Sequence, residues 1–236
     1  MMKKTLLAVA LATVSLPSVS VAEISGNVAL TTDYRFRGIS QTNRDPAIQG
    51  GFDWAHDSGF YLGTWGSNVD LASDLELDYY TGFANDINDS IAYDVGFAYY
   101  DYPGDGADQE YWEIYAGLSG DAGPVSLSGT VYYSDDFFAE TGTAWYYDLG
   151  ASYGLPYDIT LSGHFGYQTI DDGSVNDAGF FSSDEDSYKD WSIGVSKSVL
   201  GVDLDLSYID TNLGESDCID LKICDSTVVF TVSKSL

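Results

Sequence analysis

Three shortages in the sequence exclude whole classes of protein. Only 9 of its 236 residues are Lys or Arg, against 37 Asp or Glu, so the formal net charge is −28 and there is no basic surface for nucleic acid or anionic lipid. Beyond the first 22 residues no apolar run approaches the roughly 18 residues of a membrane-spanning helix, which excludes a helical membrane protein. His56 and His164 are the only histidines, and spacing assigns no Ser, His and acidic residue to the roles of a catalytic triad.

Residues 1–22 have the pattern of a signal peptide. Lys3 and Lys4 form a basic start, residues 5–16 form a short apolar segment, and residues 20–22 supply small side chains for cleavage. The residue directly after this segment is not Cys, so the sequence gives no sign of an amino-terminal lipid anchor. We therefore expect an exported protein whose mature part, residues 23–236, is one domain.

Tyrosine, glycine and alternating hydrophobicity are what the sequence has in abundance. It contains 19 Tyr and 25 Gly, and in residues 144–153 the side chains of Trp145, Tyr147 and Leu149 alternate with those of Tyr146 and Asp148. Successive side chains of a strand point to opposite faces, so such a segment is a strand with one apolar face. The pattern does not tell which face lies inside.

The same alternation recurs along the chain in about twelve segments. Most have about 9 to 12 residues, the length that a tilted strand needs to cross a bilayer. An even number of strands also brings both ends of a closed barrel to the same side. We predict strands at residues 25–37, 46–56, 59–67, 75–85, 91–102, 110–120, 125–134, 143–153, 158–168, 189–199, 202–210 and 226–236.

Short and long connections alternate between these segments. The short ones are residues 56–58, 85–90, 121–124, 155–157 and 200–201. The long ones are residues 38–45, 68–74, 103–109, 135–142, 169–188 and 211–225. Short periplasmic turns and longer extracellular loops are typical of outer-membrane barrels, and a soluble β-barrel or sandwich is the alternative. We predict an all-β fold, a single antiparallel transmembrane barrel.

Two stretches near the start of the mature chain, residues 33–42 (DYRFRGISQT) and 45–54 (DPAIQGGFDW), resemble the opening of the TorF family of porins. Residues 59–70 (GFYLGTWGSNVD) look like the next block of that family, and residues 112–117 (WEIYAG) resemble its later segments in spacing and composition. The resemblance implies an outer-membrane location and a channel role. It supplies no substrate and no catalytic residues.

Charged residues on the polar parity of the predicted strands are candidates for lining a pore. Arg35 and Arg37 share parity with Asp33 in the first predicted strand, opposite Tyr34 and Phe36. Opposed rows of basic and acidic side chains set ion preference in a pore, although the arginines could instead only neutralise buried carboxylates. The candidates are Asp33, Arg35, Arg37, Asp53, Glu76, Asp78, Asp94, Glu113, Asp148, Asp203 and Asp205. Acids far outnumber bases among them, so we expect such a channel to prefer cations.

Cys218 and Cys224 lie six residues apart in the last predicted outer loop. In an exported protein this spacing predicts a disulfide, because two thiols without a nearby His form a poor zinc site. The acidic stretch 171–190 offers oxygen ligands suited to calcium, but its spacing differs from that of a calcium-binding loop, so a solvated rim is the simpler interpretation.

The sequence thus predicts a porin-like channel in the outer membrane, open to ions and small polar solutes, with no cofactor and no enzymatic activity. A non-conducting adhesin that acts through its acidic loops, especially residues 169–188, is one alternative. An outer-membrane lipid-modifying enzyme that uses His164 is another. The expected partners are outer-membrane lipid, lipopolysaccharide (to which divalent cations could bridge the acidic loops) and, during biogenesis, the barrel assembly machinery.

Overall fold

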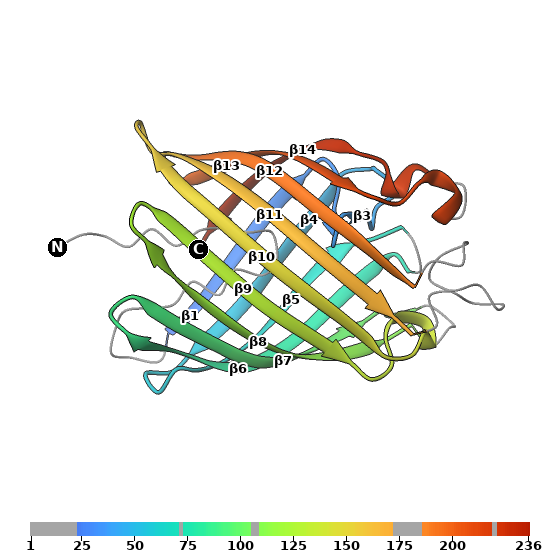
Figure 1. Cartoon of the computed structure of the whole chain (residues 1–236), viewed down its shortest axis with the longest axis horizontal. Helices are drawn as coiled ribbons and strands as arrows, with labels where there is room; N and C mark the ends of the chain where they lie inside the picture. The colour runs from blue at the N-terminus through green and yellow to red at the C-terminus, as the bar shows by residue number, and fades with distance from the viewer. Residues whose placement is uncertain (1–22, 71–72, 105–108, 172–185, 219–220) are drawn as a thin grey trace.

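The computed structural model describes residues 23–70, 73–104, 109–171, 186–218 and 221–236, which form a closed antiparallel barrel of twelve wall strands (Figure 1). The wall strands are β1 (Glu23–Thr31), β4 (Ala47–Ala55), β5 (Phe60–Asn68), β6 (Leu75–Asn88), β7 (Ile91–Asp101), β8 (Tyr111–Ala122), β9 (Val125–Ser134), β10 (Ala144–Leu155), β11 (Ile159–Ile170), β12 (Ser187–Val199), β13 (Val202–Thr211) and β14 (Thr227–Ser235). Each pairs with its neighbours in the chain, and β1 closes the ring by pairing with both β4 and β14. The predicted fold class and strand number are confirmed, and the predicted signal peptide lies outside the described residues.

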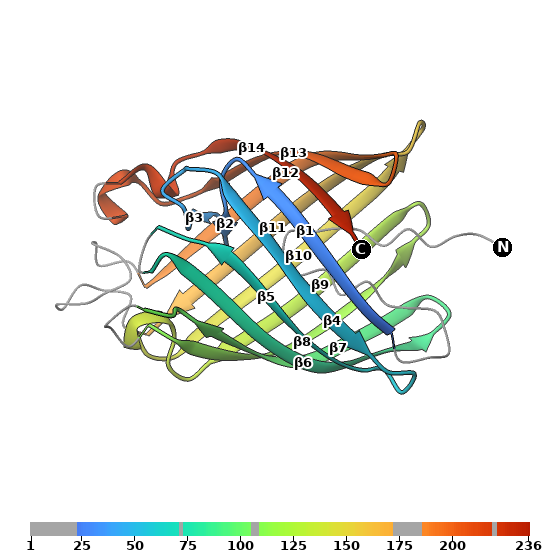
Figure 2. The same cartoon turned by 180° about the vertical axis from the view of Figure 1, so that it is seen from behind.

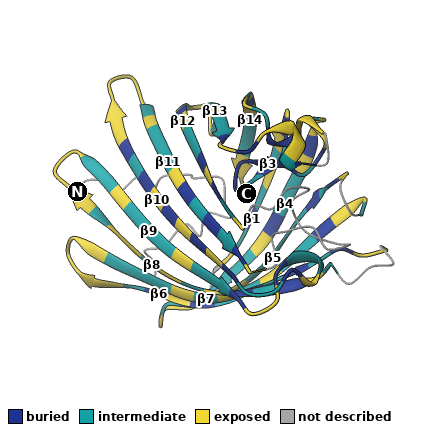
Figure 3. Ribbon diagram, turned by 45° about the vertical axis from the view of Figure 1, so that its right-hand side comes forward, coloured by how far each residue is buried: buried dark blue, intermediate teal, exposed yellow. Residues whose placement is uncertain are grey.

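The apolar parity of the strands faces outward. Along β10, Trp145, Tyr147 and Leu149 are exposed, whereas Tyr146 and Asp148 between them are buried, and Figure 3 shows this alternation as bands of colour along the strands. Leu149 is 59% exposed. A water-soluble barrel buries its apolar face, so this orientation is that of a barrel whose wall meets lipid. Among the described residues, no helical segment is long and apolar enough to span a membrane.

Aromatic side chains form two clusters on the outer face of the barrel, one near each end. Near the ends with long connections, the rings of Trp112, Tyr133, Trp145, Tyr147 and Tyr167 contact one another across β8 to β11. Near the short turns, a second cluster joins the rings of Trp54, Phe60 and Phe83. Such girdles are found where a barrel wall meets the two membrane–water interfaces.

Short turns gather at one end of the barrel and long connections at the other, as predicted. The turn end carries links such as Leu200–Gly201, and there β1 begins and β14 ends (Figure 1). The other end carries the connections from β1 to β4, β5 to β6, β7 to β8, β9 to β10, β11 to β12 and β13 to β14. We call it the loop end.

The first wall strand is shorter than predicted. β1 ends at Thr31, and residues 32–46 leave the wall to form an internal hairpin of β2 (Arg35–Phe36) and β3 (Ile39–Ser40), near the loop end in Figure 2. The prediction that residues 25–37 form one strand was therefore wrong at its end. The hairpin is extended too, so its side chains alternate just as those of a wall strand would.

Candidate pore and its inner hairpin

A two-residue turn places Arg37 at the tip of the hairpin. Arg37 and Gly38 both have positive φ (48° and 83°), the pattern of the type I′ turn that favours tight hairpins. Glycine is needed at the second position for space as well, because a Cβ on Gly38 would lie 2.5 Å from Thr211 and 2.7 Å from Asp190. The hairpin tip is therefore pressed against β12 and β13. We name residues 33–42 the inner hairpin.

From this tip, the Arg37 guanidinium reaches the opposite wall of the barrel. Its Nη2 donates to both carboxylate oxygens of Glu113 on β8, at 2.8 and 2.7 Å, and its Nη1 donates to Oε1 of Gln168 on β11 at 2.8 Å. The Tyr188 hydroxyl on β12 donates to the Arg37 carbonyl at 3.1 Å. The inner hairpin thus connects three wall strands across the lumen.

The surroundings of Arg37 keep its charge in place. The guanidinium carbon lies 4.2 Å from the ring centroid of Tyr146 and 5.2 Å from that of Tyr132, distances at which cation–π attraction operates. Burial alone would lower the pKa of Arg37, but the adjacent Glu113 carboxylate outweighs it, so the net pKa lies above the ordinary value for arginine. The side chains of Arg37 and Glu113 are each 1% exposed, which makes this a fully buried ion pair.

Apolar packing fills the barrel around the inner hairpin. Ile39 belongs to one buried cluster with residues of the barrel wall and outer connections, against which Tyr34 and Phe36 also pack. The cluster comprises Ile39, Val69, Ala98, Tyr100, Tyr102, Tyr111, Phe137, Ala144, Ile170, Tyr188, Leu213, Cys218, Ile223 and Cys224. At the loop end, therefore, the barrel encloses a hydrophobic core that packs around the inner hairpin.

Hydrogen bonds that involve Asp33, Tyr34 and Arg35 fix the base of the hairpin. Asp33 accepts from Arg35 Nε at 2.7 Å and from the Ser40 hydroxyl at 2.6 Å, which ties the two hairpin strands together. The Tyr34 hydroxyl donates to Glu76 on β6 at 2.6 Å. Burial and the nearby Glu76 carboxylate raise the pKa of Tyr34 well above its ordinary value, so this phenol remains a donor.

The predicted disulfide is confirmed, and it lies beside the inner hairpin. Cys218 and Cys224 are joined, with their Cα atoms 6.3 Å apart, and both residues are buried. Arg35 Nη1 donates to the carbonyl oxygens of Ile223 at 2.7 Å and Asp225 at 3.1 Å, the residues on either side of Cys224. We name the described residues 212–218 and 221–226 the disulfide loop.

Below the hairpin, toward the short turns, inward carboxylates are held by hydroxyl groups. Asp53 accepts from the Tyr80 hydroxyl, and Asp94 accepts from the Tyr61 hydroxyl at 2.6 Å. Asp205 accepts from the Ser207 hydroxyl at 2.6 Å. A hydroxyl donor fixes the position of a carboxylate without adding a positive charge, so no basic side chain offsets these three acidic groups.

Inward glycines allow the tyrosines of this wall to lie flat. The Tyr115 ring covers Gly96 on the adjacent strand, where an added Cβ would lie 2.5 Å from the ring. Tyr80 covers Gly63 and Tyr61 covers Gly82 in the same way. Because each ring occupies the space of a missing side chain, it follows the wall and does not project into the lumen.

His164 on β11 lies between two carboxylates. Its Nε2 is 2.7 Å from Oδ1 of Asp190 and 3.1 Å from the Tyr146 hydroxyl, and its Nδ1 is 3.5 Å from Oδ1 of Asp148. These contacts attach His164 to two carboxylates and one phenol of the barrel wall. Among the described residues, no group of three or more His, Cys, Asp or Glu is arranged to hold a metal ion.

The structure divides the predicted pore residues into four sets. Asp33, Arg35 and Arg37 belong to the inner hairpin and not to β1, so the strand assignment of both arginines was wrong, although both are buried inside the barrel. Glu76, Asp78 and Glu113 lie on the wall behind the hairpin, Asp148 lies beside His164, and Asp53, Asp94, Asp203 and Asp205 lie toward the short turns. Residues 172–185, most of the acidic stretch behind the calcium and adhesin predictions, lie outside the described residues.

Several residues of the candidate pore were missed by the sequence analysis. Asp190 shares parity with Tyr188 on β12 and is only 2% exposed, but it was counted with the acidic stretch 171–190 although the predicted strand 189–199 contains it. Gln168 was counted only as a polar member of its strand. The inward tyrosines were treated as part of the general aromatic content, although a tyrosine on the polar parity beside an inward glycine is a usable signal.

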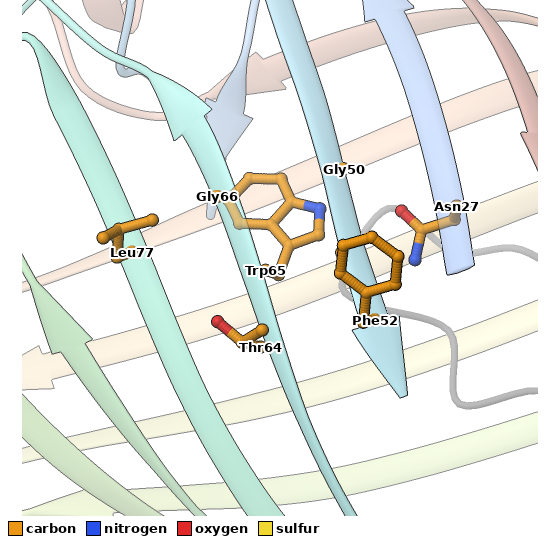
Figure 4. A pocket seen from close by; sticks show the side chains of 8 residues that line it. Asn27, Gly50, Phe52, Thr64, Trp65, Gly66 and Leu77 are labelled. Carbon is orange, nitrogen blue, oxygen red and sulfur yellow. The ribbon is translucent and has the colours of Figure 1, made fainter. Parts of the chain in front are cut away.

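The outer face carries a shallow depression formed by glycines (Figure 4). Gly50 and Gly66 have the outward parity and leave a gap between Phe52 and Leu77. Its lining comprises Asn27, Gly50, Gly51, Phe52, Thr64, Trp65, Gly66 and Leu77. The depression therefore belongs to the lipid-facing surface, and the candidate pore does not include it.

Comparison with known proteins agrees with this architecture. A family model described as "Bacterial protein of unknown function (Gcw_chp)" matches residues 17–236, and no curated protein matches the chain. The chain is similar in fold to the KdgM porin (TM-score 0.58, 8% identity, covering 91% of this chain and 98% of that chain), which is also known in complex with disordered oligogalacturonate.

Two further solved structures share the fold. They are the NanC porin (TM-score 0.56, 9% identity, covering 89% of this chain and 98% of that chain) and an outer-membrane channel from Pseudomonas putida F1 (TM-score 0.53, 12% identity, covering 92% and 96%). At these identities the likeness is one of fold, and the similar proteins are porins and channels. The matching family model does not carry the TorF name, so that resemblance stays a prediction.

Proposed function

Because the chain belongs to the bacterial family of unknown function Gcw_chp and has the barrel fold of porins, we propose that it is an outer-membrane channel that prefers cations. Its outward apolar face and its two aromatic girdles suit a lipid bilayer. Its solutes are ions and small polar molecules. On this proposal the barrel also meets lipopolysaccharide and is inserted by the barrel assembly machinery.

The observation that carries the proposal is the imbalance of charge inside the barrel. Arg37 forms an ion pair with Glu113, and Arg35 with Asp33, so neither guanidinium offsets the remaining carboxylates. The carboxylates toward the short turns are held by hydroxyl donors and have no basic partner among the described residues. Charge inside a narrow, low-dielectric passage attracts counter-ions and repels co-ions, so cations pass more readily than anions.

The same charge distribution argues against acidic oligosaccharides as cargo. The similar KdgM porin is known in complex with oligogalacturonate, a chain of carboxylated sugars. In this chain such a polyanion would face Asp53, Asp94 and Asp205, with no free inward arginine among the described residues to bind it. We therefore assign small cations and neutral polar solutes to this channel in place of polyanions.

The test is single-channel recording of the refolded mature protein in a planar bilayer under a potassium chloride gradient. Discrete conductance steps with a cation-selective reversal potential are expected. The triple variant Asp53→Asn, Asp94→Asn, Asp205→Asn should lower the potassium-to-chloride permeability ratio, because it removes three inward charges and keeps the hydrogen-bond acceptors.

A charge-matched control removes three exposed carboxylates from the short turns instead, in the triple variant Asp57→Asn, Asp89→Asn, Asp158→Asn. This control should retain most of the selectivity, because its charges lie on the rim. Equal loss of selectivity in both triple variants would show that overall charge, and not the inner wall, controls ion preference. A folded barrel that never conducts would rule out a channel.

A further inference from the structure

The inner hairpin is an insertion that the barrel wall does not need for closure. Thr31 at the end of β1 and Ala47 at the start of β4 are already paired across the sheet. Residues 32–46, which lie between these two strands, leave the wall, form the inner hairpin and return to the wall at β4. Removing them would leave two paired strand ends that a tight turn can join.

The contacts that hold the hairpin inside the barrel reach two different parts of the protein, the wall strands and the disulfide loop. At its tip, Arg37 binds Glu113 and Gln168 on the wall. At its base, Arg35 binds the carbonyl oxygens of Ile223 and Asp225 in the disulfide loop. The contacts of Arg37, and that of Tyr34 with Glu76, are made with wall strands, whereas those of Arg35 depend on the conformation of a connection outside the sheet.

The disulfide fixes the part of that connection that Arg35 contacts. Cys224 lies between the two carbonyl groups, is 0% exposed, and its own carbonyl accepts from the Thr211 hydroxyl at 3.0 Å. Ile223 packs in the same buried cluster as Ile39 of the hairpin. The bond from Cys224 to Cys218 therefore holds the two acceptors and the apolar contact in one arrangement over the hairpin.

We propose that the disulfide loop is a latch that keeps the inner hairpin in the mouth of the channel, and that reduction of Cys218–Cys224 by a small dithiol releases it. A dithiol thiolate attacks one cystine sulfur, and the mixed disulfide is resolved by the second thiol. Two electrons and two protons pass to the cysteines, and the reductant leaves as a cyclic disulfide. This inference rests on the proposed channel function.

Releasing the latch should change how often the channel visits a wider state. Without the disulfide, the carbonyl groups of Ile223 and Asp225 are no longer fixed, and Arg35 loses partners for a charge-assisted hydrogen bond. Losing about one such bond corresponds to a factor of about ten in an equilibrium. We expect openings to the larger conductance about tenfold more often.

The experiment records single channels of the mature protein in its oxidised form, after dithiothreitol treatment, and as the Cys218→Ser/Cys224→Ser double variant. Thiol labelling establishes that reduction has occurred, and the double variant provides the same test if the buried bond resists the reductant. Arg35→Met removes the donor from the hairpin side, together with its hydrogen bond to Asp33 within the hairpin, so it should open to the larger conductance at least as often as the double variant. Glu215→Gln, an exposed substitution in the same loop, is the matched control.

A barrel in which an Asn-Gly turn joins Thr31 to Ala47 separates the failure of this inference from failure of the proposed function. More frequent wide openings after reduction, in the double variant and in Arg35→Met, with Glu215→Gln unchanged, would support the latch. Unchanged openings in those three cases, alongside larger conductance in the hairpin-deleted barrel, would overturn the latch and leave the channel intact. A folded hairpin-deleted barrel that does not conduct would overturn both.

Discussion

Replacing Glu113 with glutamine tests whether the ion pair at the tip holds the inner hairpin in place. The variant keeps the size and polarity of the side chain but removes its charge, and the Arg37 guanidinium loses its only carboxylate partner among the described residues. Both side chains are 1% exposed, so water cannot replace the lost partner while the hairpin stays in the lumen. Breaking such a buried pair costs about 3–5 kcal/mol.

That cost applies to the state with the hairpin inside the barrel. In the displaced state the guanidinium is hydrated and the substitution costs little, so the equilibrium between the two states shifts by roughly two to four orders of magnitude. Glu113→Gln should therefore spend far more time at larger conductance than the wild-type protein. Single-channel dwell times measure this directly, and Glu110→Gln, an exposed neighbour, is the control.

A double variant distinguishes the loss of an ion pair from general damage to the core. Arg37→Met combined with Glu113→Leu replaces the pair with apolar side chains, a change that is often neutral in buried sites. The double variant should therefore lie closer to the wild type than Glu113→Gln does, which a double-mutant cycle quantifies. If Glu113→Gln and the wild type show the same dwell times, the ion pair does not restrain the hairpin.

Two further variants test the inner and outer faces of the wall. Gly96→Ala places a Cβ against the Tyr115 ring, which should lower conductance and cost about 1–3 kcal/mol of stability, whereas Gly154→Ala, with open space around it, should change neither. Single-channel recording and urea unfolding in lipid vesicles test this, and equal conductance in the two variants would contradict it. Leu149→Arg on the lipid-facing side should cost about 2–4 kcal/mol of folding free energy in the same vesicles, while Leu221→Arg in the disulfide loop should be tolerated. Similar unfolding curves for these two arginine variants would argue against the proposed lipid-facing surface.

The sequence predicted the wall far better than its contents, for a physical reason. Segments such as β10 alternate strictly because lipid and lumen impose opposite demands on successive side chains, and that pattern is local. The path of residues 32–46 is not local, because it depends on contacts with Glu113 and Gln168, more than 70 residues away. The alternation of side chains continues into β2, so the sequence predicted a longer first strand, whereas the chain turns inward after Thr31.

In the candidate site, the sequence likewise predicted which side chains face inward, but not which side chains they contact. Asp53 and Asp94 were identified because they lie on the polar parity of clear strands. Their tyrosine donors come from strands whose stagger only the closed barrel defines, so no spacing in the sequence could pair them. Asp190 was missed because it was counted with the acidic stretch before it, although the predicted strand 189–199 contains it.

The pairing of inward carboxylates with phenol groups separates two properties that an arginine partner would combine. In the pair of Tyr61 and Asp94, the hydroxyl determines where the carboxylate lies, and the carboxylate alone determines the local charge. Substituting the tyrosine by phenylalanine would alter orientation at constant charge, and substituting the aspartate by asparagine would alter charge at nearly constant shape. A lumen built from such pairs can change its ion preference by single substitutions while the strand register of the barrel stays the same.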